Sequence, residues 1–179
     1  IMSNKVNKGS FRIISGKYEG KKFEFLPSKD LRPTPDRLRE TLFNWLGQVI
    51  DQKTCLDLFS GTGSLGLESL SRGAHKVTFV EKNFEHFEKL KGYVERLNAI
   101  EDITIINRDV LTWLDEINDD FDLIFVDPPF YEQLAEKVLL KIKTKSLLAK
   151  SGNIYLEVEK DLDSVSYTHL TLPTIRLVG

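Results

Sequence analysis

From Thr54 onward, short apolar runs alternate along the chain with longer amphipathic segments. The strand-like runs are TCLDLF, KVTFVE, ITIINRD, FDLIFVD and NIYLEVE, and the helix-like segments between them are SLGLESLSR, FEHFEKLKGYVERLN, VLTWLDEI and YEQLAEKVLLKI. This alternation is typical of βαβ units. We therefore predict an α/β fold with a mostly parallel sheet and helices on both of its faces.

Two of the helical segments have apolar residues at a spacing of three and four. The first stripe consists of Leu38, Leu42, Trp45 and Leu46, and the second of Phe84, Phe87, Leu90, Tyr93, Val94 and Leu97. Such stripes are typical of surface helices that bury one face. We interpret the aromatic residues of the second stripe as core residues and not as a platform for stacking bases.

The chain before Thr54 has a different pattern. FRIISGKYEGKKFEF contains two β-prone runs, Phe11–Ile14 and Lys22–Phe25, and glycines between them, which predicts a small hairpin-like extension. The prolines of LRPTPDRLRETLFNWL then delay the helix, so the Arg32 segment is expected in a loop. Residues 1–40 carry ten Lys/Arg and five Asp/Glu, although the net charge of the chain is -2. This basic region indicates either a polyanionic partner or a solvated basic tail.

Length and composition set broad limits. A chain of 179 residues has room for one full domain and an appendage, and its 41% hydrophobic and 29% charged residues are ordinary for a globular protein. No apolar run has the length of a membrane span, and the polar, basic first residues lack the apolar region of a secretory signal. We expect a cytoplasmic monomer in which the single cysteine, Cys55, is a buried structural thiol.

The most informative segment, DLFSGTGSLG, follows a strand-like run and precedes a helix-like one. It contains G-x-G-x-x-G, and Glu81 lies 20 positions after Gly61, where a carboxylate suits the ribose hydroxyls of an adenosine. Both features fit a dinucleotide or S-adenosylmethionine. Asp57 favours S-adenosylmethionine, because a carboxylate there suits a cationic methionine group better than a pyrophosphate. Asp109, at the end of ITIINRD, is expected to contact adenine or to cap the next helix.

The strand-like run FDLIFVD ends in the second motif, Asp127-Pro128-Pro129-Phe130. An exocyclic amino group of a base is a poor nucleophile because its lone pair is delocalised, so an enzyme must orient it. The Asp127 carboxylate can accept one amino hydrogen and the Pro128 carbonyl the other, while the prolines fix the backbone. Phe130 can stack on a base that has been turned out of its stack. We predict that this turn is catalytic; the alternative is a rigid turn that ends a strand.

These motifs, together with RIISGKYEGKKF and RPTPDRLRETLFNWL, resemble the RsmD-like 16S rRNA guanine-N2 methyltransferases over roughly residues 11–160. The resemblance implies a Rossmann-like class I methyltransferase fold with a small N-terminal β extension, S-adenosylmethionine as cofactor without a metal, and 16S rRNA in the small ribosomal subunit or its assembly intermediate as partner. We assign cofactor binding to Asp57, Phe59, Gly61, Gly63, Glu81, Lys82, Asp109 and Val110, and RNA binding to Lys17, Lys21, Arg32, Thr34, Arg37 and Arg39. The catalytic set is Asp127, Pro128, Pro129 and Phe130.

The expected organisation is a basic β extension at residues 1–30, a methyltransferase domain at 31–163 and an atypical tail at 164–179. The tail, SVSYTHLTLPTIRLVG, does not match the family pattern, so we hypothesise that it is foreign and that the last antiparallel strands are missing. Two other functions remain open. A DNA adenine-N6 methyltransferase would use the same turn, although the chain lacks room for a target-recognition domain, and a noncatalytic RNA-binding assembly factor could keep the same fold.

Overall fold

The computed structural model describes residues 7–29, 31, 33–129, 132–158 and 174–178. In chain order its elements are β1 (Gly9–Arg12), β2 (Lys22–Phe25), α1 (Asp36–Leu46), β3 (Thr54–Leu58), α2 (Ser64–Ser71), β4 (Lys76–Val80), α3 (Phe84–Arg96), β5 (Ile103–Ile106), α4 (Val110–Glu116), β6 (Phe121–Val126), α5 (Glu132–Thr144), β7 (Leu148–Val158) and β8 (Thr174–Val178). Short 3-10 helices span Gly47–Ile50 and Ile100–Asp102. No helix among the described residues is long and apolar enough to cross a membrane.

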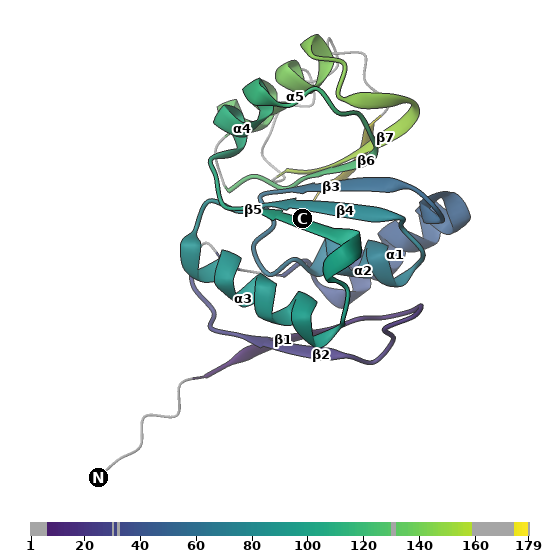
Figure 1. Cartoon of the computed structure of the whole chain (residues 1–179), viewed down its shortest axis with the longest axis vertical. Coiled ribbons are helices and arrows are strands. Elements are labelled where there is room, and N and C mark those ends of the chain that lie inside the picture. The colour runs from purple at the N-terminus through teal and green to yellow at the C-terminus, as the bar shows by residue number, and fades with distance from the viewer. Residues whose placement is uncertain (1–6, 30, 32, 130–131, 159–173, 179) are drawn as a thin grey trace.

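A parallel sheet with the strand order β5-β4-β3-β6-β7-β8 forms the centre of the molecule. Helices α1, α2 and α3 lie on one side of it and α4 and α5 on the other, as Figure 1 shows. The predicted α/β fold is confirmed. The layers follow from the order of the elements along the chain, because parallel neighbours need crossover connections, and each crossover between β3 and β7 contains a helix.

Period-two alternation within the strands separates two cores. Odd-numbered strand residues, such as Cys55, Phe79, Phe125 and Tyr155, pack with α1–α3, whereas even-numbered ones, such as Leu56, Val80, Ile124 and Leu156, pack with α4 and α5. Cys55 is fully buried, as predicted, and this burial raises the pKa of its thiol to about 12. The alternation therefore decides which side chains can meet the helix layer of α1–α3.

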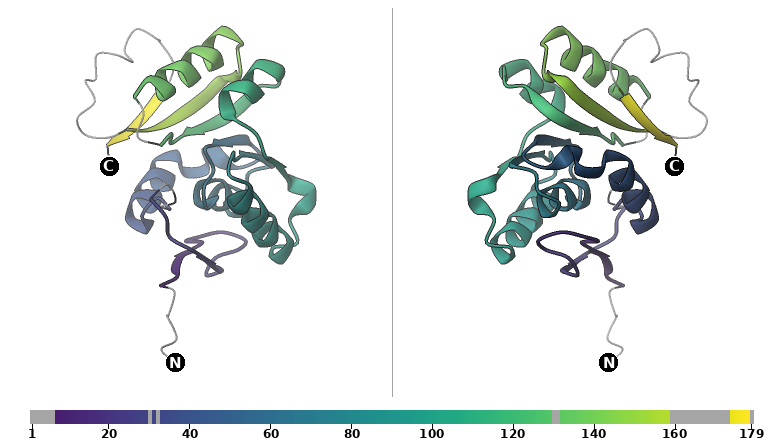
Figure 2. Two further views of the ribbon diagram at one scale, coloured as in Figure 1. Left: turned by 90° about the vertical axis from the view of Figure 1, so that its left-hand side faces the viewer. Right: turned by 90° about the vertical axis from the view of Figure 1, so that its right-hand side faces the viewer.

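The predicted hairpin is an antiparallel pair of β1 and β2 that packs beneath α3 (Figure 2). The Phe23 ring lies 5.3 Å from the Phe11 ring and 4.7 Å from the Tyr93 ring of α3, and the Tyr93 hydroxyl donates a 2.6 Å hydrogen bond to the Glu24 carbonyl. The hairpin thus shares its hydrophobic core with the sheet domain.

Glu68 of α2 holds a buried polar network that joins the hairpin to α1 and α2. Its carboxylate is fully buried and accepts hydrogen bonds from the backbone N–H groups of Ile14 at 2.9 Å and Ser15 at 3.1 Å. It also pairs with Arg72 at 2.8 Å and with Arg39 of α1 at 3.4 Å. These four donors compensate for the loss of water around the buried charge.

The predicted burial of two residues in the helical stripes, Phe84 and Trp45, is wrong. Phe84 is 63% exposed at the first position of α3, and its ring lies 6.0 Å from the ring of Phe87. Trp45 is 60% exposed, and Phe43 occupies the buried face of α1 in its place. The remaining members of both stripes face the core as predicted, apart from the half-buried Leu38 and Phe87.

At the edge of the sheet, β8 pairs with β7 in parallel. Strand β8 belongs to the segment 164–179 that the sequence marks as atypical, and residues 159–173 lie outside the described part of the chain. The foreign origin of this segment stays a prediction, which peptide mapping against the source gene would test.

Candidate active site

Four acidic side chains end four neighbouring strands on one face of the sheet. The register aligns Leu58 with both Val80 and Val126, and Val126 with Leu156. The residues that directly follow Val80, Val126 and Leu156 are Glu81, Asp127 and Glu157, and Asp57 lies one residue before Leu58. All four have odd numbers, so they belong to the face covered by α1–α3, at the carboxyl edge where α/β proteins bind ligands.

The glycine loop connects β3 to α2 along this edge. Gly61 and Gly63 have φ angles of 55° and 76°, which side-chain-bearing residues rarely adopt. A Cβ on Gly63 would lie 2.5 Å from Leu90 Cδ1. The preceding Phe59 also has a positive φ of 57°, an unfavourable conformation for an aromatic residue that often marks a functional turn. Gly63 is therefore required by its packing against Leu90, whereas the partly exposed Gly61 is the glycine of this loop that a ligand can approach.

Gly66, the third glycine of the motif, is required for a different reason, which is its close packing against Phe79. This packing leads to a prediction about stability. A Cβ at this position would lie 2.3 Å from the Phe79 ring, so Gly66→Ala is expected to lower the free energy of unfolding by about 1–3 kcal/mol and to weaken donor binding. Gly92→Ala, in the open on α3, is the matched control and is expected to stabilise by about 0.5–1 kcal/mol through helix propensity. Urea unfolding measures both changes, and equal effects would contradict this account.

Glu81 and Asp57 hold the loop in place. The Glu81 carboxylate accepts hydrogen bonds from the backbone N–H of Gly61 at 2.7 Å and of Asn83 at 2.8 Å. The buried Asp57 carboxylate accepts a 3.0 Å hydrogen bond from the backbone N–H of Gly66 in the first turn of α2. Burial raises the pKa of Asp57 well above its ordinary value, and the nearby Asp127 and Glu81 carboxylates raise it further. This carboxyl group would be stabilised in its charged form by a cationic ligand.

The other predicted cofactor residues lie around this edge in different environments. Asp109 caps α4 by accepting a 3.2 Å hydrogen bond from the backbone N–H of Thr112, and its other oxygen lies 3.8 Å from the exposed Lys82 ammonium group. The Val110 side chain is buried in the core beneath α4, and Phe59 packs against the same core. Of these groups, therefore, the Asp109 carboxylate and Lys82 remain accessible to a ligand.

Asp127 is half-buried at the end of β6, and Pro128 and the exposed Pro129 follow it. Burial raises the pKa of Asp127 to about 8, and the neighbouring Glu157 carboxylate contributes to this rise. Phe130, the last residue of the motif, lies outside the described residues. The structure thus brings Asp127 to the same edge and face as Asp57 and Glu81.

The raised pKa of Asp127 predicts how the stability of the free protein depends on pH. The folded protein keeps a proton that an unfolded aspartate, with an ordinary pKa of 3.8, releases, so stability falls as pH rises from about 4 through about 8. Asp127→Asn is expected to reduce this fall, whereas Asp120→Asn, an exposed control before β6, should behave like the wild type. Urea unfolding at pH 5 and pH 8 measures the difference. Parallel pH dependence in all three proteins would contradict the assignment.

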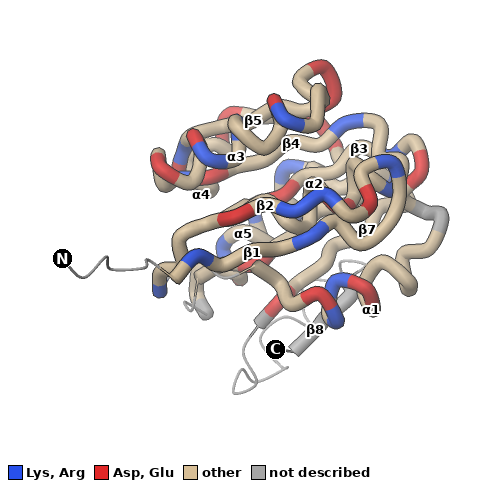
Figure 3. The backbone as a smooth tube through the Cα atoms, turned by 90° about the horizontal axis from the view of Figure 1, so that it is seen from below, with Lys and Arg blue, Asp and Glu red and all other residues tan. Residues whose placement is uncertain are grey.

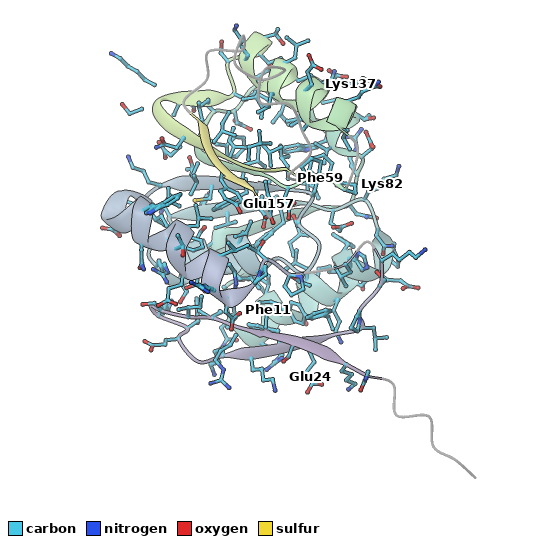
Figure 4. All side chains as sticks on the ribbon, turned by 180° about the vertical axis from the view of Figure 1, so that it is seen from behind. Phe11, Glu24, Phe59, Lys82, Lys137 and Glu157 are labelled. Atoms are coloured by element: carbon cyan, nitrogen blue, oxygen red, sulfur yellow. The ribbon has the colours of Figure 1, made fainter. Side chains whose placement is uncertain are left out.

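The sequence motifs missed Glu157 on β7. Its carboxylate accepts a 3.1 Å hydrogen bond from the Tyr155 hydroxyl and another from Thr34, and Figure 4 shows it at the sheet, above the hairpin layer of Phe11 and Glu24. Burial raises the pKa of this carboxyl group as well. The sequence did contain a signal for this residue, because Glu157 is an acidic residue within an apolar strand-like run, two positions after Tyr155. Asp57 stands in a similar run and was singled out for that reason.

The predicted RNA-binding residues separate into three groups. Lys17, Lys21 and Arg37 are exposed, and Figure 3 shows Lys and Arg positions along the backbone of the hairpin. Lys17 lies at the far end of α2 from the glycine loop, because its backbone N–H bonds to the Ser71 carbonyl at 2.8 Å. Arg32 lies outside the described residues.

Arg39 and Thr34 form the third group and do not fit a contact with RNA. Arg39 is fully buried, and its guanidinium group bonds to the carbonyls of Thr34 and Arg12 and to the carboxylates of Asp36 and Glu68. The prediction for Arg39 is therefore wrong, because the helical register of α1 directs it into the core. Thr34 is buried too and bonds to Glu157.

Comparison with known proteins identifies the family of this chain. The family model described as "Conserved hypothetical protein 95" matches residues 11–174. The ribosomal RNA small subunit methyltransferase D of Haemophilus influenzae is 42% identical over 175 residues, covering 96% of this chain and 91% of the relative. The Escherichia coli (strain K12) protein of the same name is 38% identical over 156 residues, covering 87% and 78%. A solved structure of a candidate methylase from Haemophilus influenzae has a TM-score of 0.73 at 40% identity and covers 87% of this chain and 85% of its own. The chain thus belongs to the RsmD-like methyltransferase family, and it is an enzyme of that class.

Proposed function

We propose that this enzyme transfers a methyl group from S-adenosylmethionine to the exocyclic N2 of a guanine in 16S rRNA, within the small ribosomal subunit or its assembly intermediate. The observation that carries this proposal is the position of Asp127, which lies at the same edge and on the same face of the sheet as the glycine loop and Asp57. A group that can hold a base amino group thus lies beside a loop suited to a nucleoside. We further propose that the enzyme acts as a cytoplasmic monomer.

The residues at the loop fit the proposed donor. S-adenosylmethionine, when bound, supplies a methyl group activated by a positively charged sulfur. The partly exposed Gly61 has no side chain to keep the donor away from the loop, and Asp57 supplies negative charge for the cationic methionine end. Glu81 already binds two backbone N–H groups, and each of its oxygens keeps a second lone pair for a ribose hydroxyl. Asp109 and Lys82 are the accessible polar groups for the adenine side.

The chain's own contribution to the reaction is orientation of the amino nitrogen. The Asp127 carboxylate accepts one amino hydrogen and the Pro128 carbonyl the other, which turns the nitrogen lone pair out of the ring plane toward the methyl group. As the nitrogen bonds to the methyl carbon, the carbon–sulfur bond of the donor would break and leave its electron pair on the sulfur, so the positive charge passes to the nitrogen and its hydrogen becomes acidic. Asp127 or water then accepts that proton, so no separate general base is needed.

The names of the relatives and the charge distribution support an RNA substrate. The relatives at 42% and 38% identity are named for the small ribosomal subunit. The first 40 residues are rich in Lys and Arg, and Lys17, Lys21 and Arg37 are exposed there. Exposed cations of this kind bind phosphates independently of sequence.

The test is transfer of labelled methyl from S-adenosylmethionine to small subunits that lack the modification, followed by digestion to nucleosides. Label in N2-methylguanosine is the expected result. Label in N6-methyladenosine, on DNA or RNA, would support an adenine enzyme instead. RNA binding without donor binding would support a noncatalytic assembly factor.

A further inference from the structure

We propose that Glu157 determines the choice of base, by accepting a hydrogen bond from the ring N1–H of guanine while Asp127 holds the adjacent amino group. This inference rests on the proposed function and names the residue that would restrict it to guanine.

The first support is the register of the sheet. Val126 pairs with Leu156 across β6 and β7, so Asp127 and Glu157 are consecutive neighbours that face the same side. Adjacent strands lie about 4.8 Å apart, which places two carboxylates side by side along one edge of a planar base. Their proximity is also seen in the electrostatic effect of Glu157 on the pKa of Asp127.

The second support is that the protein holds Glu157 in one orientation. The Tyr155 hydroxyl donates a 3.1 Å hydrogen bond to its Oε2, and Thr34, from the loop before α1, donates another. Tyr155 and Thr34 are both buried. A carboxylate can accept hydrogen bonds at about four sites, so Glu157 can accept a further hydrogen bond from a ligand.

The third support is that placing these two carboxylates side by side lowers the stability of the protein. Two neighbouring carboxylates in a half-buried site repel each other, and burial raises the pKa of both groups. Arrangements that cost stability in this way concentrate at functional sites. Neither Lys nor Arg among the described residues pairs with Glu157 or Asp127 in a salt bridge, so a ligand that donates hydrogen bonds would relieve this repulsion.

Base chemistry then selects guanine. Guanine presents a ring N1–H directly beside its exocyclic amino group, so its edge offers a row of donors to a row of two acceptors. Adenine and cytosine carry an amino group beside an unprotonated ring nitrogen, which would face the Glu157 carboxylate with a lone pair. A site that reads a donor in this way rejects a base that lacks it, because its own acceptor is left unpaired.

The experiment uses small subunits reconstituted with guanine or with 2-aminopurine at the position that accepts methyl. 2-Aminopurine keeps the 2-amino group but has no N1–H. The wild type is expected to prefer guanine by about 10- to 100-fold in kcat/KM. Glu157→Gln, whose amide can donate to an unprotonated ring nitrogen, is expected to reduce this preference to less than about threefold. Asp120→Asn, on the exposed loop before β6, is the matched control and should keep the wild-type preference.

The outcomes separate the two proposals. Absence of methyl transfer to guanine by the wild type would overturn the proposed function. Transfer to guanine with an unchanged preference in Glu157→Gln would overturn the role of Glu157 alone. If that variant does not fold, Thr34→Val and Tyr155→Phe, which remove the donors that orient Glu157, are measured in its place. A lower preference for guanine in either one supports the proposal, and an unchanged preference in both overturns it.

Discussion

Replacing Asp127 by asparagine is expected to slow methyl transfer by about 100- to 10,000-fold while the protein stays folded and still binds its donor. The amide has the same shape, but half of its hydrogen-bonding capacity becomes donor, so it presents an N–H where the amino group of the base needs an acceptor. Loss of the carboxylate also leaves water as the acceptor of the proton after transfer. Removing it relieves the repulsion with Glu157, so the fold is not weakened.

Single-turnover transfer to small subunits, with nucleoside digestion, measures this effect separately from product release. Asp120→Asn makes the same chemical change at the opposite end of β6, and its rate should equal that of the wild type. Donor affinity in both variants should stay within about threefold of the wild type, because one carboxylate that is not in the glycine loop contributes little to it. A rate within tenfold of the wild type for Asp127→Asn would remove the DPPF turn from the mechanism.

Replacing Arg39 by methionine is expected to lower the free energy of unfolding by about 3–5 kcal/mol. Methionine fills much of the space but leaves the buried Glu68 carboxylate without one of its cations, and it leaves the carbonyls of Thr34 and Arg12 without a donor. Because Glu68 also holds Ile14 and Ser15, the hairpin should lose protection against hydrogen exchange together with α1.

Arg37→Met is the matched control, since Arg37 lies on the exposed side of the same helix two residues earlier. Its stability should change by less than about 0.5 kcal/mol. Its affinity for small subunits should fall, and the salt dependence of binding should lose roughly one unit of slope, if it contacts a phosphate. Urea unfolding and binding at several salt concentrations measure the two effects. Equal stability of the two variants would contradict the structural role of Arg39.

The sequence by itself determined the class of the fold and was sufficient to propose most of the candidate site. Strand and helix alternation from Thr54 onward required a parallel sheet with helices, and the glycine loop, Glu81 and DPPF could be placed at strand ends because each directly follows an apolar run. The edge at which these residues meet was also predictable, because parallel strands end on the same side. These conclusions depend on local periodicity, which a single sequence contains.

The tertiary structure alone decided which charged and aromatic side chains are buried. Arg39 and Arg37 are equivalent in the sequence motif, and only the packing of α1 against Glu68 makes one structural and leaves the other exposed. Phe84 and Trp45 fit helical stripes, yet Phe84 at the start of α3 and Trp45 near the end of α1 are exposed. A role for Glu157 could be inferred only from the β6–β7 register, which places it beside Asp127. Contacts of this kind join residues far apart in the chain, so no local pattern specifies them.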